Sequence, residues 1–165
     1  MTPNFLRTSS LKGAALGALV AGGLALVIGP VQAEGSDVYS VTTSEMSFED
    51  AAQGVNDAII NKGYKVDYHG FLGEMLKRTA EDVGATQKLY KDAEFFTFCS
   101  AVVSRTAMEA DIGNIAYCPY VIFVYEDASN PGEVTIGHRT LPEGAGRDEV
   151  NALLGSLVDT AAEGF

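Results

Sequence analysis

The sequence has no tryptophan, only two cysteines and two histidines in 165 residues, and few basic side chains. Lysine and arginine number 11 against 22 aspartates and glutamates, which gives a formal net charge of −11. Binding to nucleic acid requires clustered cations that neutralise phosphates. The shortage of cations therefore argues against a nucleic-acid partner, whereas a cationic protein partner is compatible with the charge.

The sequence also lacks the short motifs of several common chemistries. It contains no Cys-x-x-Cys, so a thioredoxin-type dithiol is not supported, and no Cys-x-x-Cys-His, so covalently attached haem is excluded. Gly-x-Ser-x-Gly, the P-loop and His-Glu-x-x-His are absent as well. No pair of acids is singled out as general acid and base. We expect a protein that is not an enzyme, and leave open an enzyme of an unfamiliar type.

Residues 1–33 have the pattern of a secretory signal peptide. Arg7 and Lys12 form a positive segment, residues 13–29 are apolar, and small residues precede a cleavage point after Ala33. No twin-arginine pair is present, so we expect export through the Sec pathway and a periplasmic location. The alternative is an uncleaved anchor, but the apolar run is short for a span of about 20 residues. We therefore expect cleavage and no stable membrane insertion afterwards.

The mature region, residues 34–165, predicts a single α+β domain. Apolar residues spaced three and four apart indicate helices, and short alternating or apolar runs indicate strands. The strands are expected at 37–43, 64–69, 94–99, 120–126 and 133–139, and the helices at 48–62, 71–83, 101–110 and 148–163. The order is β-α-β-α-β-α-β-β-α. It predicts a mainly antiparallel sheet of about five strands with helices packed on it.

Two of these strands carry more specific expectations. In strand 64–69, alternation places His69 on an exposed polar face together with Lys65 and Asp67. Strand 120–126 is apolar on both faces, which is typical of a central strand covered on both sides. If helices cover only one of its faces, a second copy of the chain is the simplest cover for the other. We therefore expect a homodimer.

Cys99 and Cys118 lie at the end of strand 94–99 and just before strand 120–126. Two cysteines in an exported protein usually form one disulfide, which requires a Cα separation below about 7 Å. The first hypothesis is a non-enzymatic domain that binds a small ligand or a protein, has no cofactor, and is held by a structural Cys99–Cys118 disulfide. The second is a thiol-dependent redox or metal-handling protein that uses the same cysteines in reduced form.

The second hypothesis would use copper or haem. Thiolate and imidazole ligands suit copper, so Cys99, Cys118 and His138 are the candidate metal ligands, and a single axial His or Cys could hold haem. His138 is expected to face the core, because it shares the parity of apolar residues on strand 133–139.

The candidate ligand-binding residues are Arg105, His138 and Tyr120. Arg105 has two possible roles. It can form a surface ion pair with Glu109, four residues further along the helix. Alternatively, it can hold an anion near Cys99.

Three short motifs resemble the bacterial domain of unknown function 302 family. They are Phe48-Glu-Asp-Ala with the helix that runs to Lys62-Gly63-Tyr64-Lys65-Val66, Phe98-Cys99-Ser100-Ala101 at a helix start, and Cys118-Pro119 with the strand that ends at Glu126. The resemblance covers about residues 41–141. It implies a small α+β fold that self-associates, without an established activity, and the signal peptide would make this chain an exported member.

Overall fold

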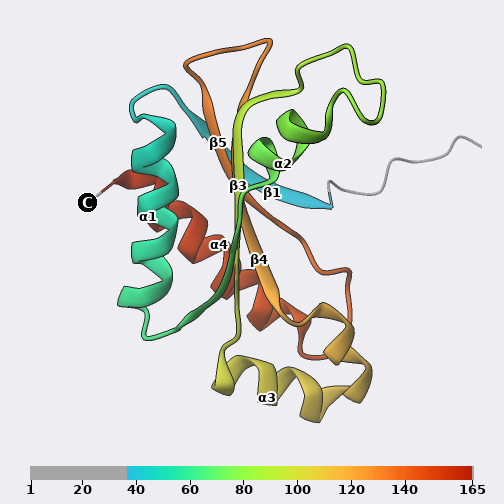
Figure 1. The fold of residues 1–165 in the computed structure, drawn as a ribbon. Helices are drawn as coiled ribbons and strands as arrows, with labels where there is room; N and C mark the ends of the chain where they lie inside the picture. The colour runs from blue at the N-terminus through green and yellow to red at the C-terminus, as the bar shows by residue number, and fades with distance from the viewer. Residues whose placement is uncertain (1–36, 165) are drawn as a thin grey trace, which may run out of the picture. The chain divides into compact units, whose positions relative to one another are not determined.

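Five strands of the described residues, 37–164, pair into one sheet in the computed structural model (Figure 1). The order across the sheet is β1-β5-β4-β3-β2, and each neighbouring pair is antiparallel. The strands are β1 (Val38–Thr43), β2 (Val66–Gly70), β3 (Tyr90–Phe98), β4 (Tyr120–Asp127) and β5 (Val134–Arg139). The helices are α1 (Phe48–Asn61), α2 (Leu72–Thr79), α3 (Ala101–Ala110), the 3₁₀ helix η1 (Ile112–Tyr117) and α4 (Arg147–Glu163).

The predicted α+β class, the antiparallel sheet and the order of its strands and helices are confirmed. The predicted signal peptide lies outside the described residues, so export and a periplasmic location stay predictions. Within residues 37–164, no helix is both long enough and apolar enough to cross a membrane.

The predicted helix starts and the end of α1 have identifiable local causes. The Ser47 hydroxyl accepts a hydrogen bond from the Asp50 amide at 3.1 Å, and the Ser100 hydroxyl accepts one from the Val103 amide at 3.2 Å. Each bond satisfies an amide that the first turn of a helix leaves unpaired. Gly63, just after α1, has a φ of 88°, a left-handed conformation that glycine adopts without a steric penalty.

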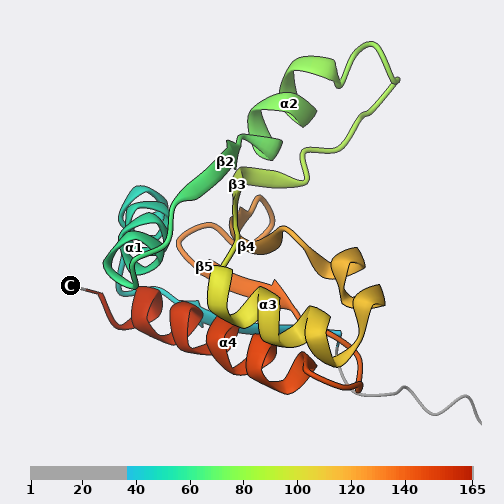
Figure 2. The same cartoon turned by 90° about the horizontal axis from the view of Figure 1, so that it is seen from below.

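One face of the sheet is buried under helices. Figure 2 shows α1, α3 and α4 together beside the sheet, whereas α2 lies apart from them at the β2–β3 edge. The core therefore forms between the strands and the pair α1 and α4. Its members include Val55, Ile59, Phe96, Phe98, Ile122, Val124, Ile136, Leu154 and Val158.

The other face of β4 is not covered by these helices. Tyr120, Ile122 and Val124 are buried on the helix side, but Val121 on the opposite side is 37% exposed. The expectation that β4 is covered on both faces is therefore not met by the described residues. This open face is the surface that a homodimer would use, and the homodimer stays a prediction.

Two irregularities in the strands correct the expected alternation. β2 changes register against β3 between Val66 and Tyr68, so His69 pairs with Phe96 on the helix side. Its ring stacks on Phe96 at 4.1 Å between centroids, and its Nε2 lies 2.7 Å from Glu94 Oε2. The expectation of an exposed His69 is thus only partly met, because a bulge turns the residue to the helix side, where its side chain stays 36% exposed.

β3 begins four residues earlier than expected. It contains a bulge whose extra residue pairs with a buried acid. The register shift between Tyr90 and Asp92 leaves Lys91 as the extra residue. Lys91 Nζ lies 3.0 and 2.9 Å from the two carboxylate oxygens of Glu126, which is only 2% exposed. The Gly132 amide donates to the same carboxylate at 2.7 Å. Glu126 therefore joins β3, β4 and the β4–β5 turn.

The first prediction concerns this carboxylate. The Gly132 amide and the Lys91 ammonium hold the pKa of Glu126 below its ordinary value. We expect Glu126→Gln to lower the free energy of unfolding by about 2 kcal/mol at pH 7, because it weakens charged hydrogen bonds to a buried group. The folded-state pKa lies below the unfolded value of about 4.3, so this stabilisation is present above that pH and is lost as the pH falls. Urea unfolding at pH 7 and pH 4 measures both effects.

Glu109→Gln is the matched control. Glu109 is paired with Arg105 at 2.8 Å, but both side chains are largely exposed. Surface ion pairs contribute about 0–1 kcal/mol, so this variant should unfold close to the wild type. Equal losses in the two variants would contradict the structural role of Glu126.

Candidate functional site

The two cysteines come together at one end of the sheet. β3 and β4 are neighbours, and Phe98 pairs with Tyr120. Cys99 therefore follows β3 where Cys118 precedes β4, and their Sγ atoms lie 4.0 Å apart. The expected proximity is confirmed. A disulfide has an S–S distance of about 2.0 Å, so both residues are free thiols here and the disulfide stays a prediction.

A serine and a tyrosine complete the cysteine pair. Ser104, on α3, donates a hydrogen bond to Tyr120 Oη at 3.2 Å, and its Oγ lies 3.5 Å from Cys118 Sγ. A serine hydroxyl has one hydrogen, so the thiol of Cys118 is the donor to Ser104. A chain of contacts thus runs from Cys99 through Cys118 and Ser104 to Tyr120.

The environment of Cys99 disfavours its thiolate. Burial raises the pKa of the Cys99 thiol to about 11, and the neighbouring Cys118 adds to the effect. A cysteine acts as a nucleophile or a metal ligand in its thiolate form, which nearby cations, a metal ion or a helix N-terminus stabilise. The side chain of Cys99 is exposed, and at neutral pH its thiol is mainly protonated.

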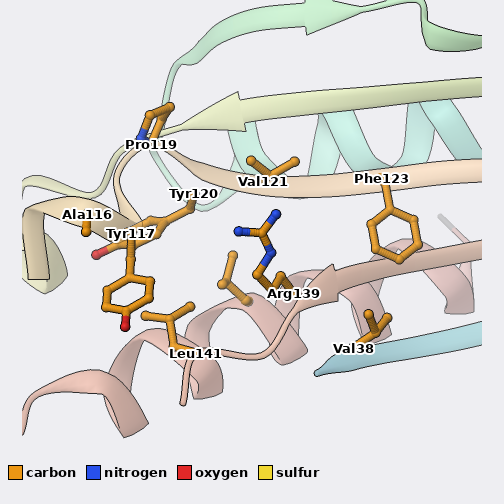
Figure 3. Close-up of a pocket in the computed structure, with 10 residues that line it drawn as sticks. Val38, Ala116, Tyr117, Pro119, Tyr120, Val121, Phe123, Arg139 and Leu141 are labelled. Atoms are coloured by element: carbon orange, nitrogen blue, oxygen red, sulfur yellow. The ribbon is translucent and has the colours of Figure 1, made fainter. Parts of the chain in front are cut away.

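A cavity of about 310 Å³ lies beside this end of the sheet (Figure 3). Its walls come from β1, β4, β5, η1, α4 and the segments that flank β4 and β5. We call it the Arg139 cavity, and its walls include Val38, Tyr117, Val121, Phe123, Leu141 and Arg139. Tyr120 also lines it, so the cysteine pair and the cavity share one side chain.

Arg139 is the only charged residue among the ten that line this cavity. Figure 3 shows its guanidinium beside Val121, between Tyr120 and Phe123. Within residues 37–164, no carboxylate lies within ion-pair distance of Arg139, and its side chain makes no hydrogen bond. The cavity therefore combines mainly apolar walls with one unpaired cation.

Gly137 leaves room for the ring of Phe123 on the neighbouring strand. These residues pair across β4 and β5, and a Cβ atom at position 137 would come within 2.6 Å of Phe123 Cζ and 2.7 Å of the Tyr39 carbonyl oxygen. The absence of a side chain on β5 thus makes room for the ring that forms one wall of the cavity.

The remaining candidate residues lie elsewhere. Arg105 is exposed, and its Nε is 2.8 Å from Glu109 Oε1, so the expected surface ion pair forms. His138 is 2% exposed, its Nδ1 lies 2.9 Å from the Arg139 carbonyl oxygen, and burial lowers its pKa.

His138 is also separated from the cysteines. It pairs with Ile122, four residues along β4 from Cys118, which is about 13 Å of strand. In the described part of the chain, no three His, Cys, Asp or Glu side chains gather into a set that could hold a metal ion. The three candidate metal ligands are thus not brought together.

Sequence reasoning missed Ser104 and Arg139. Ser104 carries no motif, and only the packing of α3 on the end of β4 brings it to Cys118. The position of Arg139 could have been predicted. Successive residues of a strand face opposite sides, so if His138 faces the core, Arg139 faces away from it.

The fold and the site define a small α+β domain with a thiol pair and a mainly apolar cavity. Residues 39–153 match the model of the family described as Domain of unknown function DUF302, and the chain belongs to this family. The resemblance inferred from the three motifs is thereby confirmed.

Among solved structures, the chain is similar to an uncharacterized conserved protein DUF302 from Bacillus stearothermophilus. The TM-score is 0.60 at 13% identity, over 76% of this chain and 98% of the other. At this identity the likeness shows the fold alone. No curated protein matches the chain.

The second prediction concerns the reactivity of Cys99. The wild type and Cys118→Ala are both reduced and treated with iodoacetamide. Peptide mass spectrometry then measures the rate at which Cys99 is labelled. We expect wild-type Cys99 at pH 8 to react at least about a hundredfold more slowly than a free thiol, because few molecules carry the thiolate. In Cys118→Ala the pKa of Cys99 should fall but stay above its ordinary value, since burial remains. Labelling at the rate of a free thiol would contradict the account.

Proposed function

We propose that the protein is an exported, non-enzymatic module that binds one small molecule in the Arg139 cavity, with a structural Cys99–Cys118 disulfide beside the site. The observation that carries the proposal is the cavity itself. Its volume of about 310 Å³ is at the lower end of the range of about 300–1,000 Å³ that small-molecule sites occupy. Mainly apolar walls with few polar groups are also typical of such sites.

The chemistry of the lining supports binding rather than catalysis. Tyrosine and arginine are the titratable residue types among the ten that line the cavity, and no Asp, Glu, His, Cys or Ser is present there. A hydrolytic or acyl-transfer reaction needs an activated nucleophile or a general base within reach of the ligand.

The cysteine pair supports a structural role. The two Sγ atoms lie 4.0 Å apart at neighbouring strand ends and would have to approach to about 2.0 Å for a disulfide to form. A redox or metal-handling role would need a thiolate, and the raised pKa of Cys99 weighs against one. In an oxidising compartment, a disulfide oxidant would take the two thiol hydrogens as the S–S bond forms.

The third prediction tests the cavity. The neutral fluorescent probe indole, which is about the size of one ring with a short chain, should bind at one saturable site. We expect Val121→Asp to weaken this binding by at least about tenfold, because the probe would then have to desolvate a carboxylate in the wall. Fluorescence titration gives the two dissociation constants, and circular dichroism verifies that the variant is folded.

Val102→Asp is the matched control. Val102 is exposed on α3 and does not line the cavity, so the same substitution should leave the affinity within about twofold. Equal affinities of the wild type and Val121→Asp would place the probe elsewhere and refute the proposed site.

The fourth prediction tests the disulfide. The chain exported in a cell and purified without reductant should weigh two hydrogen atoms less than the same chain after reduction. Reduction should lower the free energy of unfolding by about 2–4 kcal/mol. If two thiols are alkylated in the unfolded, unreduced protein, no bond joins Cys99 and Cys118.

A further inference from the structure

We infer that the Arg139 cavity selects a small aromatic carboxylate, whose anionic end pairs with the Arg139 guanidinium. This inference rests on the proposed function, because it names the ligand class for the same cavity. It goes further by assigning recognition of charge to one residue.

The first support is the state of the guanidinium. Arginine presents several N–H donors in a planar fork that matches the two oxygens of a carboxylate. Lys91, Arg105 and Arg147 all pair with carboxylates of the chain. Among residues 37–164 Arg139 has no such partner, although it lines a cavity and the neighbouring Thr140 amide donates to the Asp37 carbonyl at 2.8 Å. Because Arg139 is exposed at the end of β5, a carboxylate ligand could reach its guanidinium.

The acidic character of the protein does not outweigh this contact. A net charge of −11 repels anions in general. However, exposed charges further away than the screening length of about 8 Å act weakly at physiological salt. No carboxylate lines the cavity, and an ion pair with Arg139 would form at contact distance. The Arg139 cation therefore determines that the preferred ligand is negatively charged.

The aromatic residues of the cavity walls favour a ligand that contains an aromatic ring. Tyr117, Tyr120 and Phe123 are the three aromatic residues that line the cavity, and Tyr120 among them is buried. Tyr117 is held from one side by Arg147, whose Cζ lies 4.8 Å from the ring centroid. Arg147 itself donates to Asn114 at 2.8 Å and is paired with Asp111, so it is committed to the protein. Aromatic rings attract one another in offset or edge-to-face arrangements beyond their buried area.

The volume limits the ligand to about the size of one ring with a short chain. A water molecule occupies about 30 Å³ of liquid, so the cavity accommodates about ten groups of that size. A phenyl ring with a three-carbon acid matches this size.

The test compares three molecules that share the same phenylpropyl skeleton and differ in charge. 3-Phenylpropanoate, 3-phenylpropan-1-ol and 3-phenylpropylamine are titrated separately into the full mature protein at pH 7, and amide NMR shifts give each dissociation constant. We expect the carboxylate to bind at least about tenfold more tightly than the alcohol, and the amine to bind most weakly.

Arg139→Gln is then titrated with the same three molecules. The ratio of the alcohol and carboxylate dissociation constants, taken within each variant, should fall from about ten to about one or below. Arg78→Gln is the matched control, because Arg78 is an exposed arginine on α2 that does not line the cavity. It should keep the wild-type ratio.

The outcomes separate this inference from the proposed function. If the alcohol binds as tightly as the carboxylate, selection of an anion is overturned while the binding cavity stands. If Arg139→Gln and Arg78→Gln lower the ratio equally, general charge and not Arg139 selects the ligand, which also overturns the inference. If none of the three molecules shifts a resonance at millimolar concentration, both the inference and the proposed cavity site fail.

Discussion

The alternation of side chains along β4 is the constraint on which the rest of the structure depends. Successive residues of a strand face opposite sides, and pairing with β3 and β5 fixes which side each one takes. Ile122 and Val124 are consequently buried under α1 and α4, while Val121 and Phe123 face the cavity. A shift of one residue would exchange these two sets, so the core and the cavity are two results of one register.

The same register connects the thiol pair to the cavity. Pairing of Phe98 with Tyr120 brings the end of β3 beside the start of β4, which places the two sulfur atoms 4.0 Å apart. Tyr120 then belongs to both places, because its hydroxyl accepts from Ser104 and it is among the residues that line the cavity. The cysteine pair lies at this end of the sheet, and Arg139 supplies the charge that a ligand would meet.

Much of the fold follows from the sequence because its causes are local. The helix starts at Ser47 and Ser100 are hydrogen bonds within one turn. The inward position of His138 follows from parity along a regular strand. The bulges in β2 and β3 were not predictable in this way, because they depend on pairing with a neighbouring strand, and the β2 bulge turned His69 to the helix side of the sheet. The cavity was missed for the same reason: its walls come from segments far apart in the sequence.

A structure of the oxidised mature protein crystallised with 3-phenylpropanoate tests the account most directly. The account predicts electron density for one ligand among Tyr117, Val121 and Phe123, with its two carboxylate oxygens at hydrogen-bond distance from the Arg139 guanidinium. Density at another surface, or a carboxylate that points away from Arg139, would contradict the assignment of this cavity as the binding site.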